Sequence, residues 1–289
     1  MWKIARSVVW IAGTLLASVV LTIGIHYLSS GLRVHSSAKS SISIVSEGSD
    51  YDIWRYIAKS NDAKKAGLKI TVKEITDGVQ MNKATSQGTV DANAFQSWTY
   101  LGAYNKQNLK GKLTAVGTTY LEPMGIYSKK YSNVKDIPEG ATIALANDAA
   151  DESRGLLLLQ EAKLIKLKKN FSALSGVSDI VSNPKQFKFK TIDDHTGPRI
   201  LNQIDAVLIS NTIALEGGLH VLTDSIYHEK VDQSTKNNVN VIATSEKNKN
   251  SKSIKKLVKL YHQKDIQKYI KQKYYGTKIE VQKPISYLN

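Results

Sequence analysis

The sequence contains no cysteine, and this absence excludes several kinds of chemistry. The chain forms no disulfide, no thiolate metal site and no thiol nucleophile, and it offers no cysteine for lipid attachment. It also has no Gly-x-Ser-x-Gly elbow, no His-Glu-x-x-His helix and no phosphate-binding glycine loop. We therefore expect a protein that is not an enzyme and that uses neither a cofactor nor a metal ion.

One short run keeps an enzymatic alternative open. Asp193, Asp194 and His195 follow one another, and His220 and His228 lie downstream, so a hydrolytic or metal site is conceivable. Adjacent residues in a loop rarely point at one metal ion, which makes this signal weak.

Acidic residues are scarce relative to basic ones. The chain has 289 residues, with 40 Lys and Arg against 25 Asp and Glu, which gives a formal net charge of +15. Such a surface suits nucleic acid, an anionic membrane or an anionic cell wall. The lysines between Lys247 and Lys283 lack the arginine and aromatic interleaving of a base-reading surface, so we do not expect a nucleic-acid partner.

The N-terminus has the only long stretch without charge. Ser7 to Leu28 is uncharged if His26 is neutral, and as a helix it would be ~33 Å long, enough to span a bilayer. We expect an uncleaved transmembrane anchor or signal at 1–30, a polar tether at 31–40 and a binding domain outside the cell membrane. The alternative is a cleaved signal, with Ser36 and Ala38 forming the cleavage site.

Beyond the tether, strand and helix patterns alternate and predict an α/β fold with mainly parallel sheets. We expect a two-lobed architecture in which 41–123 and 240–289 form the first lobe and 124–239 form the second. A cleft at the strand ends between the lobes would bind the ligand. The predicted strands are 41–46, 69–75, 88–94, 113–121, 124–127, 142–146, 187–192, 205–209 and 239–244, and the predicted helices are 53–61, 77–87, 155–167, 195–204 and 251–275.

The stretch Ala141 to Leu159 is the most informative. It predicts a buried strand, a polar loop from Asn147 to Ser153, and a helix with Arg154 in its first turn. A positive side chain at the positive end of a helix is unfavourable unless it binds an anion, so Arg154 is a candidate for binding a small anionic ligand. The alternative is a surface ion pair between Arg154 and Asp151 or Glu152.

Several runs together resemble a known family. They are ITDGVQMNKA at 75–84, TVDANAFQSWTYL at 89–101, LEPMGIYSKKY at 121–131, IPEGATIALAND at 137–148, SRGLLLLQEAKLIKLK at 153–168 and IDAVLISNTIALEGGL at 204–219. The chain resembles the NlpA or MetQ family of methionine-type substrate-binding lipoproteins of ABC importers. The resemblance implies a periplasmic-binding-protein fold of type II, capture of an amino acid outside the membrane, and delivery to permease and ATPase subunits.

The resemblance also implies roles for individual residues. Arg154 would receive the ligand carboxylate in a bidentate pair, and Asn147 would shape the adjacent loop. Phe95 would form an apolar wall, or would simply pack in the core. Ser97 stands where the family commonly has His, and Ser210 stands where it has Asn. The neighbouring Asn211 could supply the missing amide, although a shift of one residue at a strand end changes the face of the side chain.

Further departures concern the size and charge of the pocket. Gly78, Ala94 and Ile213 stand where the family commonly has Tyr, Phe and Tyr, so we expect a larger pocket and weak binding of methionine. Glu47, Asp50 and Asp52 lie in a loop that differs from the family pattern and could hold a ligand ammonium, with helix capping as the alternative for the two aspartates.

The function that follows is an extracytoplasmic substrate-binding component of an ABC importer for a methionine-like amino acid or a short peptide. The alternative is a membrane-anchored solute sensor or wall-binding protein with the same two-lobed fold. In either case the anchor would take the place of a lipid.

Overall fold

The computed structural model describes residues 40–172 and 175–289. The predicted membrane span and most of the predicted tether lie outside these residues. Within the described part, no helix combines the length and the apolar character needed to cross a bilayer.

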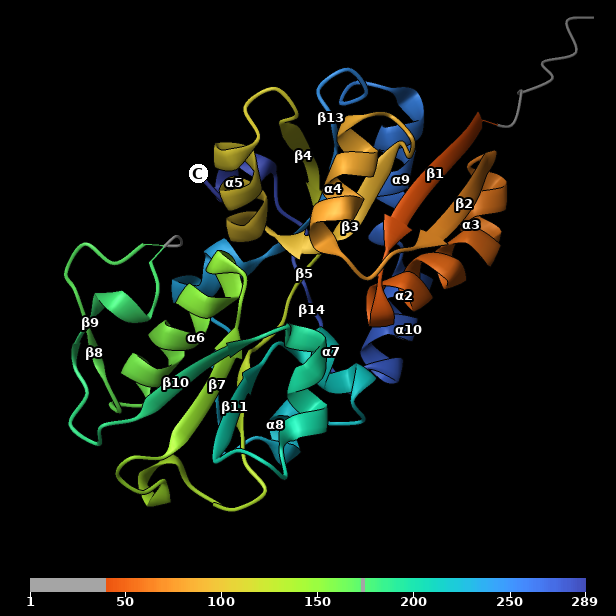
Figure 1. Ribbon diagram of the computed structural model, residues 1–289. Helices are drawn as coiled ribbons and strands as arrows, with labels where there is room; N and C mark the ends of the chain where they lie inside the picture. The colour runs from red at the N-terminus through yellow and green to blue at the C-terminus, as the bar shows by residue number, and fades with distance from the viewer. Residues whose placement is uncertain (1–39, 173–174) are drawn as a thin grey trace, which may run out of the picture. The chain divides into compact units, whose positions relative to one another are not determined.

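The first sheet has five strands in the order β2-β1-β3-β13-β4 (Figure 1). β1 pairs in parallel with β2 and β3, whereas β13 pairs antiparallel with β3 and β4. The strands are β1 (Ser40–Ser46), β2 (Leu68–Glu74), β3 (Ala92–Ser97), β4 (Leu113–Thr118) and β13 (Asn240–Ser245).

Helices cover both faces of this sheet. On one face Ile53 of α2 and Leu257 of α9 pack with Ile44 and Ile242 of the sheet. On the other face Leu101 of α5 packs against strand residues such as Val241. The helices around this sheet are α2 (Gly48–Lys59), α3 (Asn61–Lys65), α4 (Gly78–Ser86), α5 (Trp98–Gln107), α9 (Lys252–Tyr261) and α10 (Lys264–Lys273).

The second sheet has the order β10-β7-β11-β6-β12. It consists of β6 (Gly125–Tyr127), β7 (Thr142–Ala146), β10 (Lys188–Ile192), β11 (Ala206–Ile209) and β12 (Tyr227–His228). Leucines of α6 (Ala149–Glu161) pack on one face, and α7 (Asn211–Glu216), α8 (Val221–Asp224) and the 3-10 helix η3 (Asp194–Ile200) cover the other. A two-stranded ribbon of β8 (Lys166–Leu167) and β9 (Ile180–Ser182) is attached, and short 3-10 turns lie at Val134–Asp136, Val177–Asp179, Gln233–Asn238 and Ile285–Tyr287.

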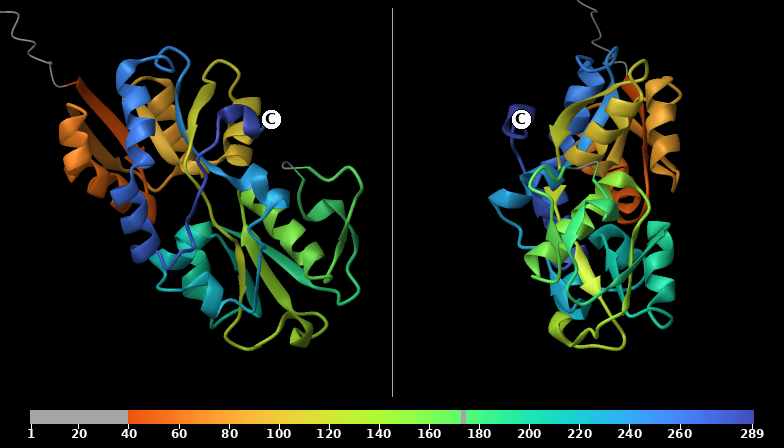
Figure 2. Two further views of the ribbon diagram at one scale, coloured as in Figure 1. Left: turned by 180° about the vertical axis from the view of Figure 1, so that it is seen from behind. Right: turned by 60° about the vertical axis from the view of Figure 1, so that its left-hand side comes forward.

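The two sheets and their helices form the two lobes, one above the other in Figure 1 and again in both views of Figure 2. Between them β5 (Tyr120–Leu121) pairs antiparallel with β14 (Ile279–Glu280), and α2 of the first lobe contacts α7 of the second. The predicted α/β, two-lobed architecture is thus the observed one. The exact lobe boundaries at 123 and 240 stay a prediction.

The local predictions were wrong in several places. The helix predicted at 155–167 ends at Glu161, and the helix predicted at 195–204 is the 3-10 helix η3, which ends at Ile200. Both sheets are mixed rather than mainly parallel, because β13, β6 and β12 run antiparallel to their neighbours. The expected C-terminal helix at 251–275 is two helices, interrupted at His262, whose ring contacts Glu280 Oε1 and the carbonyl of Thr118. The third strand lies a few residues later than expected, at Ala92–Ser97, and α5 and α7 were not predicted.

The start of α6 is a further difference. The polar stretch predicted as a loop is helical from Ala149, because the Asp148 carboxylate accepts hydrogen bonds from the backbone N–H groups of Ala150 and Asp151. Arg154 therefore lies in the second turn and not the first. The argument from the helix dipole does not apply to it.

Candidate ligand-binding site

A cavity of about 650 Å³ lies between the lobes, where strands of both sheets end. Asp77 follows β2, Ser97 ends β3, Asn147 follows β7 and Ser210 follows β11, and all four residues line the cavity. This is the expected location for a ligand site in sheets with parallel strands, and the volume is ordinary for a small-molecule pocket.

Five of the six predicted site residues line this cavity: Phe95, Ser97, Asn147, Arg154 and Ser210. Their contact with a ligand stays a prediction. Asn211 does not line it. Ser210 is the N-cap of α7, so the next side chain turns into the contact between the lobes, where Asn211 Nδ2 donates to Glu122 Oε2 at 2.8 Å and to Thr277 Oγ1 at 3.2 Å.

Arg154 is 8% exposed and already has a carboxylate partner. Its Nε donates to Glu229 Oε1 at 2.9 Å, and its Nη2 donates to Glu229 Oε2 at 2.6 Å and to the carbonyl of Glu122 at 2.8 Å. Burial by itself would lower the pKa of Arg154, but Glu229 outweighs burial and raises it. The partner is neither Asp151 nor Glu152, and the charge is balanced in the ligand-free protein.

One end of this guanidinium is still available. Among the described residues no acceptor bonds to Nη1 of Arg154, while Nε and Nη2 are both engaged. Because Arg154 lines the cavity, Nη1 offers two N–H donors to an anionic group there.

An aromatic wall forms where the sequence suggested lost contacts. The rings of Phe95 and Tyr100 meet edge to face with centroids 5.7 Å apart, and both line the cavity. A Cβ on Gly78 would lie 2.6 Å from the Tyr100 hydroxyl and 2.8 Å from Phe95, so these rings occupy the space that a side chain at position 78 would take. Ala94 is buried in the core of the first lobe and is no part of the wall.

Three carboxyl groups gather at the second lobe's side of the cavity. Asp148 and Asp151 come from the start of α6, and Asp194 comes from η3. Burial raises the pKa of each, to about 7 for Asp194, and the charge of Asp148 raises the pKa values of Asp151 and Asp194 further. Asp194 accepts a hydrogen bond from Ser210 Oγ at 3.2 Å, whereas the Asp151 carboxyl has no hydrogen-bond partner among the described residues.

His195 connects the two lobes. Its Nδ1 is 3.2 Å from Glu216 Oε2 and its Nε2 is 3.5 Å from Glu47 Oε2, on the first lobe. These carboxylates raise the pKa of His195 to about 10, and burial raises the pKa of Glu47 to about 7. Within residues 40–172 and 175–289, no group of His, Cys, Asp and Glu side chains is arranged to hold a metal ion.

Of the three acidic residues near the first loop, only Glu47 lines the cavity. Asp52 pairs with Lys273 at 2.7 Å outside it. Asp50 is buried in a polar network between the lobes, so neither aspartate caps a helix or faces a ligand.

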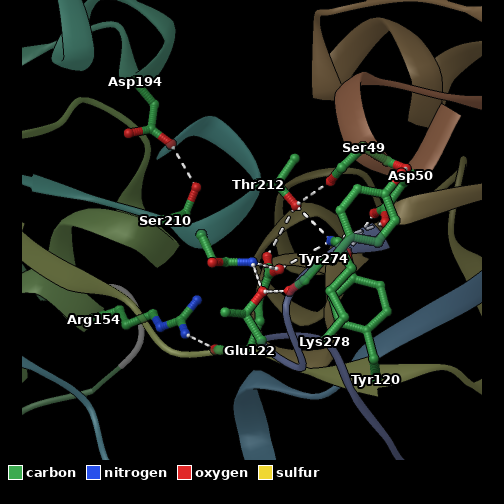
Figure 3. Close-up of polar contacts among 12 residues, drawn as sticks. Ser49, Asp50, Tyr120, Glu122, Arg154, Asp194, Ser210, Thr212, Tyr274 and Lys278 are labelled. Carbon is green, nitrogen blue, oxygen red and sulfur yellow. Dashed lines mark hydrogen bonds and ion pairs between the residues drawn. The ribbon is translucent and has the colours of Figure 1, made fainter. Parts of the chain in front are cut away.

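Lys278 is the centre of that network (Figure 3). Its Nζ lies 3.1 Å from Asp50 Oδ1, 3.0 Å from Glu122 Oε2 and 2.9 Å from Thr212 Oγ1, and sits 3.9 Å from the centre of the Tyr120 ring. Burial tends to raise the pKa of Glu122, but Lys278 and the hydrogen bond from Asn211 outweigh it and lower that pKa. The network joins α2 of the first lobe to α7 of the second.

The raised pKa values of the groups on the acidic side of the cavity predict that the stability of the ligand-free protein falls as the pH rises. Because the folded pKa of Asp194 is raised from 3.8 to about 7, its contribution is fully present below about pH 4 and is lost as the pH rises through 7. The raised pKa of His195 acts in the same direction up to about pH 10. Asp194→Asn should therefore stabilise the ligand-free protein by about 1 to 3 kcal/mol at pH 8 and by little at pH 4.

Urea unfolding of both proteins at pH 4 and pH 8 tests this expectation. Asp62→Asn, which alters an aspartate away from the cavity, is the matched control and should behave as the unmodified protein at both pH values. An Asp194→Asn variant that gains nothing at pH 8 would show that this carboxyl is not destabilised by its surroundings.

Comparison with known proteins shows to which family the chain belongs. Residues 44–282 match the model of the NlpA lipoprotein family. The chain belongs to this family. The methionine-binding lipoprotein MetQ of Bacillus subtilis (strain 168) is 37% identical over 223 residues, which are 75% of this chain and 80% of the relative.

Solved structures of similar proteins show the same two-lobed fold. A nutrient-binding protein from Burkholderia cenocepacia bound to methionine has a TM-score of 0.79 and 36% identity, covering 83% of this chain and 99% of the other. An ABC transporter periplasmic substrate-binding protein from Coxiella burnetii has a TM-score of 0.78 and 30% identity, covering 83% of this chain and 100% of the other. The predicted family and the predicted fold of the binding domain are confirmed.

Proposed function

We propose that this protein is the extracytoplasmic substrate-binding component of an ABC importer and that its ligand is an amino acid or a short peptide. The observation that carries the proposal is the cavity between two lobes in a member of a family whose relatives include a methionine-bound structure. The protein binds its ligand without changing it, and its partners are permease and ATPase subunits.

The chemistry of the cavity suits a zwitterion. Nη1 of Arg154 provides donors for a carboxylate, and the carboxyl groups of Asp148, Asp151 and Asp194 provide acceptors for an ammonium. The rings of Phe95 and Tyr100 provide an apolar surface between polar groups. Asn147, Ser97 and Ser210 would supply the remaining polar contacts.

Equilibrium binding tests the proposal. The full-length protein, unfolded to remove any bound ligand and then refolded in detergent, is titrated with the twenty free amino acids and a dipeptide set. Saturable binding of at least one compound at micromolar or tighter concentration supports the proposal. No binding of any compound would contradict it, and recovery of the protein without a permease after mild crosslinking in cells would favour the sensor alternative.

We further propose that the segment 1–30 stays on the mature chain as a membrane anchor in place of a lipid. The proposal is supported by the long uncharged stretch and by the absence of cysteine. Intact-mass measurement of the membrane-extracted protein should give the mass of the uncleaved chain, and a mature N-terminus near Lys39 would contradict the anchor.

A further inference from the structure

The charges that line the cavity are not balanced. Arg154 is paired with Glu229, and Glu122 with Lys278, so neither pair leaves a net charge. His195 is shared between Glu47 and Glu216. Three of the remaining lining acids, Asp77, Asp148 and Asp193, accept backbone N–H groups as helix N-caps. Asp151 and Asp194 have no such role, and the only other cation of the lining is the exposed Arg199.

The acidic groups share the cavity with a hydrogen-bond donor, Arg154, which suits the carboxylate group of a ligand. Arg154 is more than nine-tenths buried, and its Nη1 has no partner among the described residues. Asp151 precedes Arg154 by three residues in α6, and residues at this spacing lie on one face of a helix. A site for a carboxylate therefore lies beside a site for positive charge.

From this arrangement we infer that the ligand is an α-amino acid whose side chain carries a positive charge, either free or as a residue of a short peptide. The inference rests on the proposed function and specifies its substrate class. The α-carboxylate bonds to Arg154 Nη1, and the α-ammonium and the side-chain cation are held by the carboxyl groups of Asp148, Asp151 and Asp194.

The same arrangement disfavours a ligand with a neutral side chain. A single α-ammonium leaves at least one of Asp151 and Asp194 without a positive partner in a partly desolvated space, which is unfavourable for charged groups. Asp148 already accepts two backbone N–H groups at the start of α6. A second positive charge offsets the mutual repulsion among these carboxyl groups, which in the empty cavity raises the pKa values of Asp151 and Asp194. A guanidinium or ammonium group also supplies the hydrogen-bond donor that Asp151 lacks.

The experiment compares ligands that differ only in charge. The stripped full-length protein is titrated by calorimetry at pH 7.5 with L-arginine and its neutral isostere L-citrulline, and with L-lysine and its neutral counterpart L-norleucine. We expect the cationic member of at least one pair to bind on the order of 100-fold more tightly than the neutral one, because the neutral ligand leaves buried charges unpaired.

Variants identify the groups responsible. Asp151→Asn and Asp194→Asn should each weaken the cationic ligand by at least about 10-fold. Each should weaken the neutral ligand by a clearly smaller factor, because that ligand places only its α-ammonium on these carboxyl groups. Both variants should fold, since they remove repulsion. Asp62→Asn, away from the cavity, should bind both ligands as the unmodified protein does.

Dipeptides distinguish a free cationic amino acid from a peptide that contains one. If L-arginyl-glycine binds and free arginine does not, with citrullyl-glycine weaker by the same factor, the ligand is a peptide and the inference holds. If methionine, norleucine or citrulline binds as tightly as the cationic compounds, the inference is overturned while the proposed function stands. If no amino acid or dipeptide binds, both fail.

Discussion

Replacing Lys278 with methionine is expected to lower the free energy of unfolding by about 3 to 5 kcal/mol, the usual cost of removing one partner of a buried ion pair. Lys278 is 4% exposed, and its Nζ is the cation nearest to the buried carboxylates of Asp50 and Glu122. Methionine has a similar length, so the loss reflects charge and hydrogen bonds rather than a cavity. Urea unfolding at pH 7.5 measures it.

If the loss in Lys278→Met comes from unpaired charge, a second substitution that removes a carboxylate should offset part of it. Adding Glu122→Gln to Lys278→Met removes one of the two unpaired carboxylates and should recover part of the loss. The control is Lys271→Met in α10, which replaces an exposed lysine and should change stability by less than about 0.5 kcal/mol. If Lys278→Met behaves like this control, Lys278 does not hold the network together.

The network also bears on how the two lobes are held together. Asp50 belongs to α2 of the first lobe and Thr212 to α7 of the second, and both contact Lys278 Nζ. A cation that bonds to both lobes favours the arrangement in which they meet. Loss of Lys278 should therefore weaken ligand binding as well as stability, because the two lobes that line the cavity are then held in this arrangement without this contact.

The sequence predicted the fold well because its signals are local. Apolar alternation located β1, β2 and β7 within one or two residues, since each strand carries its own pattern of buried side chains. It failed where tertiary contacts decide, as at the end of α9, where His262 bonds to Thr118 and Glu280. It also placed residues 149–153 in a loop, although α6 begins at Ala149.

The site was predicted less completely, for a similar reason. Arg154 and Ser210 were found from motifs, but the partner of Arg154 is Glu229, which is 75 positions away and carries no local signal. Lys278 comes from the lysine-rich C-terminal part of the chain, where nothing separates it by pattern from exposed lysines. Tyr100 was missed because it lies in α5, which was not predicted.

Arg154 shows how a distant partner changes an expectation. On the sequence alone, the charge of Arg154 is unfavourable in the empty protein, and its loss is expected to affect binding far more than folding. The structure contradicts the expectation that folding depends little on Arg154. Arg154→Met leaves Glu229 buried without its cation, and we expect a loss of about 3 to 5 kcal/mol of unfolding free energy in the ligand-free protein.

A double variant separates the two roles of Arg154. Glu229→Gln keeps an acceptor for the backbone N–H of Met124 but removes the buried charge, so Arg154→Met/Glu229→Gln should regain most of the stability. Ligand affinity should not return, because Nη1 is still absent, and the deficit should be about 2 to 5 kcal/mol. Arg154→Lys should also bind weakly, since one ammonium cannot bond to both Glu229 oxygens and a ligand carboxylate. Unfolding and ligand titration of the three variants decide the matter: a double variant that is stable and binds as tightly as the unmodified protein would make Arg154 a structural partner of Glu229 and nothing more.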